Sequence, residues 1–230
     1  MLTSTYSRWM IVLVLILLSA TAQMVSASPG SQTWYFTKAA NTTVDAPYAN
    51  DGWVHDKDLV MNTTKPTSGT YCVLDGQKAL WFYANKGAQT DLEFGEYNWT
   101  AKINTSDPNE KKGNTTTVDI CKITPGGTVT VIASGSKPLQ DNTNEYDILC
   151  TDNTSTTQSF STGDWLGVRV SWNGSTDDTL WIYYKPDKDS YITSPSTDPG
   201  YPVPELPTLA LFSVGLLILA GCAYMGRRTE

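Results

Sequence analysis

Apolar and polar positions alternate with a period of two along most of the stretch from residue 30 to residue 195, without a sustained helical period. Trp99, Ala101 and Ile103 share one face of such a segment, while Thr100 and Lys102 share the other. This alternation is typical of a β-strand that is buried on one face. The same criterion predicts about nine short strands, at 33–37, 79–83, 91–94, 98–104, 117–120, 128–133, 146–150, 166–172 and 179–184.

Gly, Pro, Asn and Asp separate these segments, as in the turn Pro125-Gly126-Gly127. Many short strands joined by turns favour an all-β domain, and we predict an antiparallel β-sandwich with a jelly-roll-like order of strands. An immunoglobulin-like sandwich is the second expectation. Residues 163–170 (GDWLGVRV) resemble the penultimate strand of jelly-roll modules, which occur in carbohydrate-binding domains and in many microbial surface proteins.

The N-terminus has the pattern of a secretory signal peptide. Arg8 precedes an apolar stretch from Met10 to Leu18, and Val25-Ser26-Ala27 offers a cleavage site with small residues. We therefore predict a signal peptide over 1–27, with an uncleaved N-terminal anchor as the alternative. The β-sandwich ectodomain is expected to follow over 28–195.

The C-terminus predicts a membrane anchor. A proline-rich linker over 196–205 precedes the apolar residues 206–226, which as a helix would span about 30 Å, the thickness of a hydrocarbon core. Residues 227–230 form a short basic tail that the positive-inside rule assigns to the cytoplasm. The prediction is a protein anchored at the cell surface with its ectodomain outside.

The same C-terminal residues resemble a known sorting signal. Pro204, Glu205, Leu206, Pro207 and Thr208 stand before the apolar span, and Arg227 and Arg228 follow it. This arrangement is similar to the PEF-CTERM signal of archaeal surface proteins, whose motif has Phe where Leu206 stands. The resemblance implies processing by an archaeosortase after cleavage by signal peptidase. The alternative is a tail anchor that is never processed.

Charge excludes some classes of partner. The chain has 16 basic and 23 acidic residues, a net charge of −7 and a pI near 4.7. Between residues 28 and 205 there are 13 basic and 22 acidic residues, so the predicted ectodomain carries −9. Nucleic acid is not expected as a partner, because phosphate binding needs clustered Lys and Arg.

Seven of the 12 asparagines lie in Asn-x-Ser/Thr sequons, an excess that predicts an N-glycosylated surface. They are Asn41, Asn62, Asn98, Asn104, Asn114, Asn153 and Asn173. Three cysteines lie outside the apolar termini, and we expect Cys121 and Cys150 to form a disulfide because both lie in apolar-alternating segments that we expect to be strands of one sandwich. Buried free thiols are the alternative.

Candidates for chemistry are few. A single histidine, His55, makes Ser-His-Asp or Cys-His catalysis improbable, and we expect no enzyme and no cofactor. Asp51, Asp56 and Asp58 lie close together in a loop-like stretch, a pattern compatible with a structural calcium ion or with a solvated acidic loop.

Aromatic residues are the remaining candidates. In 81–83 and 181–184 large aromatic groups occupy both faces of the alternation, so one face must point outward or into a second contact. Exposed aromatic rings stack on sugars and anchor interfaces, and they also fill cores. The candidate ligand-binding residues are Trp53, Trp81, Trp181 and Tyr183.

These features together predict a secreted, glycosylated, surface-anchored β-sandwich with a structural or adhesive role in the cell envelope. Its expected partners are the membrane and either glycans or envelope proteins. A carbohydrate-binding module that uses exposed aromatics is the alternative function, and a glycoside hydrolase is the remote one, because no catalytic signature accompanies the carboxylates.

Overall fold

The computed structural model describes residues 30–43, 46–95, 98–106, 114–139, 143–152 and 157–201. They form thirteen strands and one short 3₁₀ turn, η1 (Asn41–Thr43). The strands are β1 (Thr33–Ala40), β2 (His55–Asn62), β3 (Tyr71–Asp75), β4 (Ala79–Ala84), β5 (Leu92–Phe94), β6 (Trp99–Ser106), β7 (Thr115–Ile123), β8 (Val129–Pro138), β9 (Thr143–Asp152), β10 (Gln158–Phe160), β11 (Trp165–Trp172), β12 (Thr179–Tyr183) and β13 (Tyr191–Thr193).

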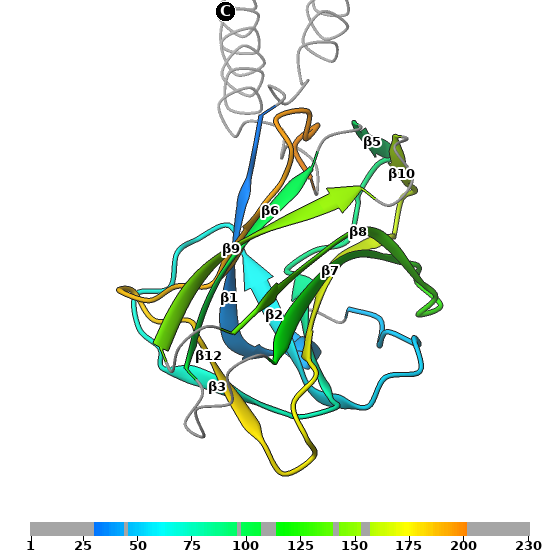
Figure 1. The fold of residues 1–230 in the computed structure, drawn as a ribbon. Coiled ribbons are helices and arrows are strands. Elements are labelled where there is room, and N and C mark those ends of the chain that lie inside the picture. Colours follow the sequence, from blue (N-terminus) through cyan, green and yellow to red (C-terminus); the bar gives the residue numbers. More distant parts are fainter. Residues whose placement is uncertain are drawn as a thin grey trace, which may run out of the picture. The chain divides into compact units, whose positions relative to one another are not determined.

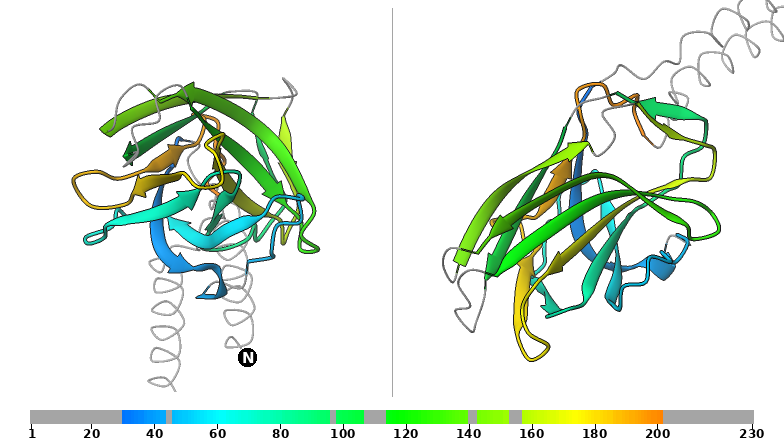
Figure 2. Two further views of the ribbon diagram at one scale, coloured as in Figure 1. Left: turned by 60° about the horizontal axis from the view of Figure 1, so that its bottom comes forward. Right: turned by 45° about the vertical axis from the view of Figure 1, so that its right-hand side comes forward.

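The main sheet closes on itself. Its order is β13-β1-β2-β4-β11-β7-β8-β9-β6, and the ring closes because β13 pairs with β6 as well as with β1. The two views in Figure 2 show the green strands β7 and β8 curving around the interior that this ring encloses. The antiparallel pair β3 and β12 extends the sheet beyond β6, and β5 pairs with β10 separately.

The predicted antiparallel β-sandwich of jelly-roll type is therefore wrong, and so is the immunoglobulin-like alternative. The fold is a closed, mixed barrel of nine strands (Figure 1). Two pairings account for the difference. The three-residue strand β13 joins β1 to β6, and β2 runs parallel to β4 because the chain between them leaves the barrel to form β3. The alternation of apolar and polar residues indicates which face of a strand is buried. It does not indicate which strands pair when they are far apart in the sequence.

All nine segments that alternation predicts are strands, but four further strands were not predicted from the sequence. These are β2, β3, β10 and β13. Strand β2 begins with His55, Asp56, Lys57 and Asp58, so its first half has no apolar face to detect. Strands β10 and β13 have only three residues each, which is too short for a period-two pattern to appear.

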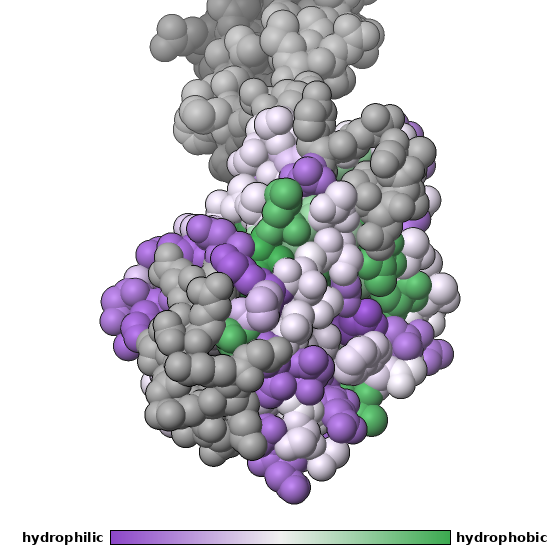
Figure 3. All heavy atoms as spheres, viewed as in Figure 1, coloured by the Kyte–Doolittle hydropathy of each residue, from purple (hydrophilic) through white to green (hydrophobic). Residues whose placement is uncertain are grey.

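The inner faces of the barrel strands carry the larger apolar core. Trp34, Phe36, Phe82 and Ile103 are fully buried in it, and Phe36 stacks on Phe82 with 3.9 Å between ring centroids. On the outside, Figure 3 shows only small, separate apolar patches among hydrophilic residues on the face viewed. The closed sheet thus buries its apolar face in the interior.

Strand β4 is buried on both faces, and this explains its aromatic run. Leu80 and Phe82 point into the larger core, while Trp81 and Tyr83 belong to a second, smaller cluster with Cys121. Ala49, from the stretch before β2, packs in this second cluster. The sequence predicts that one face of residues 81–83 points outward or makes a second contact. The structure shows such a contact, because the stretch around Ala49 covers Trp81 and Tyr83 on the outer face of the sheet.

The compact unit reaches beyond the predicted end of the ectodomain at 195. It comprises Pro29–Pro202, and Tyr201 is 1% exposed, with its ring against Trp34 and Phe160. The Tyr201 hydroxyl donates to the carbonyl of Lys86 and accepts from the backbone N–H of Leu166. No helix within the described residues is long and apolar enough to cross a membrane.

Candidate functional site

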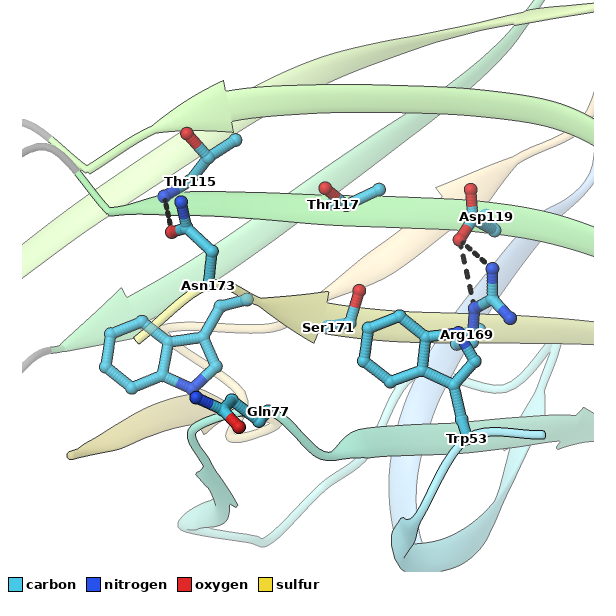
Figure 4. A pocket seen from close by; sticks show the side chains of 9 residues that line it. Trp53, Gln77, Thr115, Thr117, Asp119, Arg169, Ser171 and Asn173 are labelled. Atoms are coloured by element: carbon cyan, nitrogen blue, oxygen red, sulfur yellow. Dashed lines mark hydrogen bonds and ion pairs between the residues drawn. The ribbon is translucent and has the colours of Figure 1, made fainter. Parts of the chain in front are cut away.

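The outer faces of β7 and β11 form the floor of a groove of about 650 Å³ (Figure 4). The strands are antiparallel neighbours, with Asp119 opposite Arg169 and Thr117 opposite Ser171. Because alternate residues of a strand point to the same face, these four side chains share the outer surface. The residues that line the groove are Trp53, Gln77, Thr115, Thr117, Asp119, Arg169, Ser171, Trp172 and Asn173.

Arg169 is held between two carboxylates at one end of the groove. Its Nε and Nη2 donate to Asp119 Oδ2 at 3.0 and 2.7 Å, and its Nη1 donates to Asp51 Oδ2 at 2.6 Å. Ser134 Oγ donates to the other oxygen of Asp119. The side chains of Arg169, Asp51 and Asp119 are only 13%, 5% and 8% exposed, so this is a largely buried, charge-assisted network.

His55 extends the network beneath the groove. Its Nε2 lies 3.3 Å from Asp51 Oδ1, and its Nδ1 lies 2.9 Å from Asp58 Oδ1. The hydroxyl of Tyr83 donates to the same oxygen of Asp58 and accepts from the backbone N–H of Ala49. These bonds tie the segment from Ala49 to Asp58 to the outer face of β4.

Trp53 stands at the rim of the groove and is fixed by this network. Its backbone N–H donates to Asp51 Oδ1 at 3.1 Å, and its ring lies 5.2 Å from the Arg169 guanidinium carbon. The residue is 38% exposed, so part of the indole faces solvent. A cation beneath one face of an indole leaves the opposite face free to stack on a ligand.

Burial and hydrogen bonding shift the pKa of Asp51 in opposite directions. Burial by itself raises the pKa of a carboxyl, but bonds from Arg169, from the Trp53 N–H and from His55 outweigh it. The pKa of Asp51 therefore lies below its ordinary value, and the group is ionised at neutral pH.

The structure separates the four predicted ligand-binding aromatics. Trp53 lines the groove, whereas Trp81 is fully buried below it and lies 6.0 Å from the Arg169 guanidinium carbon. Trp181 and Tyr183 are half-buried on the outer face of the antiparallel pair β3 and β12. There Trp181 stacks on Tyr71 with 4.3 Å between centroids.

The candidate calcium ligands have other partners. Asp51 and Asp58 come together, as the sequence suggested, but their oxygens accept from Arg169, His55 and Tyr83. Asp56 has one buried oxygen, Oδ2, without a hydrogen-bond partner. Within the described ranges no group of three or more His, Cys, Asp or Glu residues is arranged to hold a metal ion. Calcium here stays a prediction that the geometry does not favour.

The predicted sequons differ in exposure. Asn98 and Asn173 are exposed, while Asn62 and Asn114 are half-buried. Two others are buried: Asn104, at 4% exposed, donates from Nδ2 to the carbonyl of Asp189, and Asn41 donates to that of Ala46. A glycan on either would break these bonds, so we expect both to be unmodified in the folded protein.

The predicted disulfide between Cys121 and Cys150 is absent. Both are free buried thiols, as is Cys72. Cys121 belongs to the cluster on the outer face of the sheet, and Cys150 belongs to the inner core. The intervening sheet separates the two sulfur atoms, which sequence alternation alone did not reveal. Burial raises the pKa of the Cys72 thiol to about 11 and that of Cys150 to about 12.

Sequence reasoning missed the polar floor of the groove, above all Asp119 and Arg169. One signal was available, because Arg169 is the single arginine between residues 28 and 205 and stands on an otherwise apolar strand. The remaining predicted sites lie outside the described residues. They are the signal peptide at 1–27, Asn153, the membrane segment at 206–226, and the sorting residues Pro204, Glu205, Leu206, Pro207, Thr208, Arg227 and Arg228.

The comparisons with known proteins bear on the fold. No protein-family model and no curated protein matches the sequence. Two crystal structures of a CocE/NonD family hydrolase from Staphylococcus aureus are similar to this chain. One has 14% identity and a TM-score of 0.50 over 72% of this chain, and the other has 15% identity and a TM-score of 0.51 over 73%.

In both cases the match spans 36% of the hydrolase chain. At this level of identity the likeness concerns the fold alone. A barrel of this kind thus occurs as part of a hydrolase. The expectation that the present chain is not itself an enzyme stays a prediction.

Proposed function

We propose that this chain is a carbohydrate-binding β-barrel, displayed at the cell surface, with an adhesive role in the cell envelope. The observation that carries the proposal is the groove on β7 and β11. A half-exposed indole, Trp53, lines it together with hydroxyl and amide side chains such as Thr117, Ser171 and Gln77. Sugar rings present apolar C–H faces and polar hydroxyl edges, which match these two kinds of group.

The fixed position of Trp53 favours binding. Its backbone bond to Asp51 and its contact with Arg169 hold the ring before a ligand arrives. A preorganised aromatic anchor loses little conformational entropy on binding, which improves affinity for a small ligand.

The charge of the groove favours a neutral sugar. Arg169 supplies one positive charge, but Asp51 and Asp119 surround it with two negative ones. A carboxylated or sulfated sugar would therefore meet a net negative site in a domain that is itself strongly acidic. We propose a neutral hexose or pentose polymer as the ligand class.

The groove supports binding better than hydrolysis. Glycoside hydrolysis needs one carboxyl that is protonated and another that is free to act as nucleophile or base. Asp119 and Asp51 both accept from Arg169, and the pKa of Asp51 is lowered rather than raised. We therefore keep the proposal of a non-enzymatic protein.

The predicted termini complete the proposal. A signal peptide at 1–27 would direct export, and the segment at 206–226 would anchor the chain or be removed by an archaeosortase. The sequons support an exposed, glycosylated surface outside the cell. Mass spectrometry of the protein from its native cells tests this part, because an intact C-terminal segment would contradict processing.

The binding proposal is tested with the full chain, made in cells that do not glycosylate asparagine, on an array of neutral and acidic glycans. We expect neutral glycans to bind, and Trp53→Ala to weaken this binding at least about tenfold, the equivalent of 1.4 kcal/mol. Trp181→Ala, a second half-buried tryptophan away from the groove, is the matched control and should bind normally. Equal binding by both variants, or no bound glycan at all, would contradict the proposal.

A further inference from the structure

One predicted glycosylation sequon lies inside the groove. Asn173 directly follows β11, is exposed, and lines the groove together with Thr115 (Figure 4). Its neighbours Gly174 and Ser175 complete an Asn-Gly-Ser sequon. Within the described ranges one other sequon asparagine is exposed, Asn98, which stands before β6, a strand that pairs with neither β7 nor β11.

We propose that N-glycosylation of Asn173 covers the groove, so that occupancy of this one sequon controls access to Trp53. The proposal rests on the proposed function, because it assumes that the groove accommodates sugar. In the modification, Nδ2 of Asn173 forms a bond to the anomeric carbon of a lipid-phosphate-linked glycan, Nδ2 loses a proton, and the lipid phosphate leaves.

The hydrogen bonds of Asn173 aim its side chain along the groove. The backbone N–H of Asn173 donates to the carbonyl of Thr115 at 3.2 Å, and Asn173 Oδ1 accepts from the N–H of Thr115 at 2.5 Å. These bonds use the backbone and Oδ1, whereas glycosylation uses Nδ2. The folded site is therefore compatible with a glycan that starts at this end of the groove.

The groove is short enough for an attached glycan to cross it. Figure 4 shows Thr115 and Asn173 at one end, and Asp119, Arg169 and Trp53 toward the other. From Thr115 to Asp119 the strand advances about 13 Å, at roughly 3.3 Å per residue. A short oligosaccharide has a comparable length, so its outer rings would reach the indole of Trp53.

A tethered glycan competes strongly with free sugar. A short tether gives the attached glycan a local concentration in the millimolar range, which is maintained as long as the bond exists. Weak sugar binding by a single shallow groove would be largely suppressed by such a competitor. The modified chain is then expected to bind free glycans at least about tenfold more weakly than the unmodified chain.

The experiment compares the full chain made in cells that glycosylate asparagine with the full chain made in cells that do not. Ser175→Ala removes the sequon and leaves Asn173 in place, while Ser175→Thr keeps the sequon. Thr100→Ala removes the distant sequon of Asn98 and is the matched control. Because Ser175 Oγ donates to Asp178 Oδ2, a comparison of unmodified Ser175→Ala with the unmodified wild-type chain shows separately what loss of that bond does.

Two readouts are taken after mass spectrometry has determined which sequons are occupied. Glycan binding should be weak for the modified wild type, Ser175→Thr and Thr100→Ala, and strong for Ser175→Ala and the unmodified chain. Oxidation of Trp53 by N-bromosuccinimide, followed peptide by peptide, should be slow in the first group and fast in the second. The oxidation readout needs no sugar ligand.

The outcomes separate the two proposals. If Trp53 is oxidised equally fast with and without a glycan on Asn173, or if Asn173 is left unmodified while Asn98 is glycosylated, the covering role is wrong. If Trp53 is protected but neither form binds any glycan, the covering role stands and the proposed function is wrong.

Discussion

Replacing Arg169 with methionine would leave two buried carboxylates without their cation. Asp51 and Asp119 are 5% and 8% exposed, and Arg169 supplies three hydrogen bonds to them. Methionine keeps most of the length of the side chain, so the change removes charge more than volume. The variant is expected to fold less stably because two buried carboxylates then lose the charge-assisted bonds from Arg169.

The expected loss is about 3–5 kcal/mol, the range for breaking a buried ion pair by removing one partner. For a domain of this size, 1 kcal/mol corresponds to roughly 2–4 °C in Tm, so Tm should fall by about 6–20 °C at neutral pH. Thermal unfolding followed by circular dichroism measures this shift. Lys78→Met is the matched control, because Lys78 pairs with Asp75 at the surface, where the side chains are 38% and 34% exposed.

The pH dependence gives a second, independent check. In the wild type the pKa of Asp51 is lowered, so its contribution is present above the unfolded value near 3.9 and is lost as the pH falls through the folded value. Without Arg169, the bonds that most strongly lower the pKa of Asp51 are lost, so this pKa is higher in the variant than in the wild type. The variant then loses less stability than the wild type as the pH falls from 7 toward 4, and its deficit relative to the wild type shrinks.

The reasoning is refuted if Arg169→Met and Lys78→Met have the same Tm at pH 7. It is also refuted if the deficit of Arg169→Met is constant between pH 7 and pH 4. Either result would mean that water solvates Asp51 and Asp119 once the arginine is removed.

Two further predictions concern the second cluster and the thiols. Tyr83→Phe leaves the buried N–H of Ala49 unpaired and should lower the free energy of unfolding by about 1–3 kcal/mol in urea titrations; Tyr48→Phe, at a residue that is 60% exposed, should change little. Because burial raises the pKa of Cys72 to about 11 and that of Cys150 to about 12, Ellman's reagent should label the thiols only after unfolding, and dithiothreitol should not change Tm. Rapid labelling of Cys72 or Cys150 in the native protein would contradict their burial, and a lower Tm after reduction would contradict the free-thiol assignment.

The sequence predicted only some of the residues of the candidate site. The sequence singles out Asp51 and Asp58 as candidate calcium ligands and Trp53 as a candidate ligand-binding aromatic. Arg169, which binds Asp51, is 118 residues away from it, and nothing local to either residue indicates that they meet. The acidic stretch was interpreted as a site for a metal cation. In the structure the cationic partner of Asp51 is the guanidinium of Arg169, and the imidazole of His55 also contacts Asp51.

The aromatic runs 81–83 and 181–184 likewise were predicted only in part from the sequence. Sequence alternation established that large groups occupy both faces of 81–83 and 181–184. It left undecided what covers the outer face. In β4 the stretch around Ala49 covers Trp81 and Tyr83, whereas in β12 Trp181 and Tyr183 stay half-exposed beside Tyr71.

The sequence by itself determined an all-β domain, the positions of nine strands, their inward faces, and an acidic composition with seven sequons. These properties are local, because alternation within one strand decides which side chains meet the core. The tertiary structure alone decided that the sheet closes through β13, that β2 runs parallel to β4, that Cys121 and Cys150 lie on opposite faces of the sheet, and that Asp51, Asp119 and Arg169 meet beneath Trp53. Such pairings join residues far apart in the chain, and the free energy that selects them comes from burial across the whole barrel rather than from any one segment.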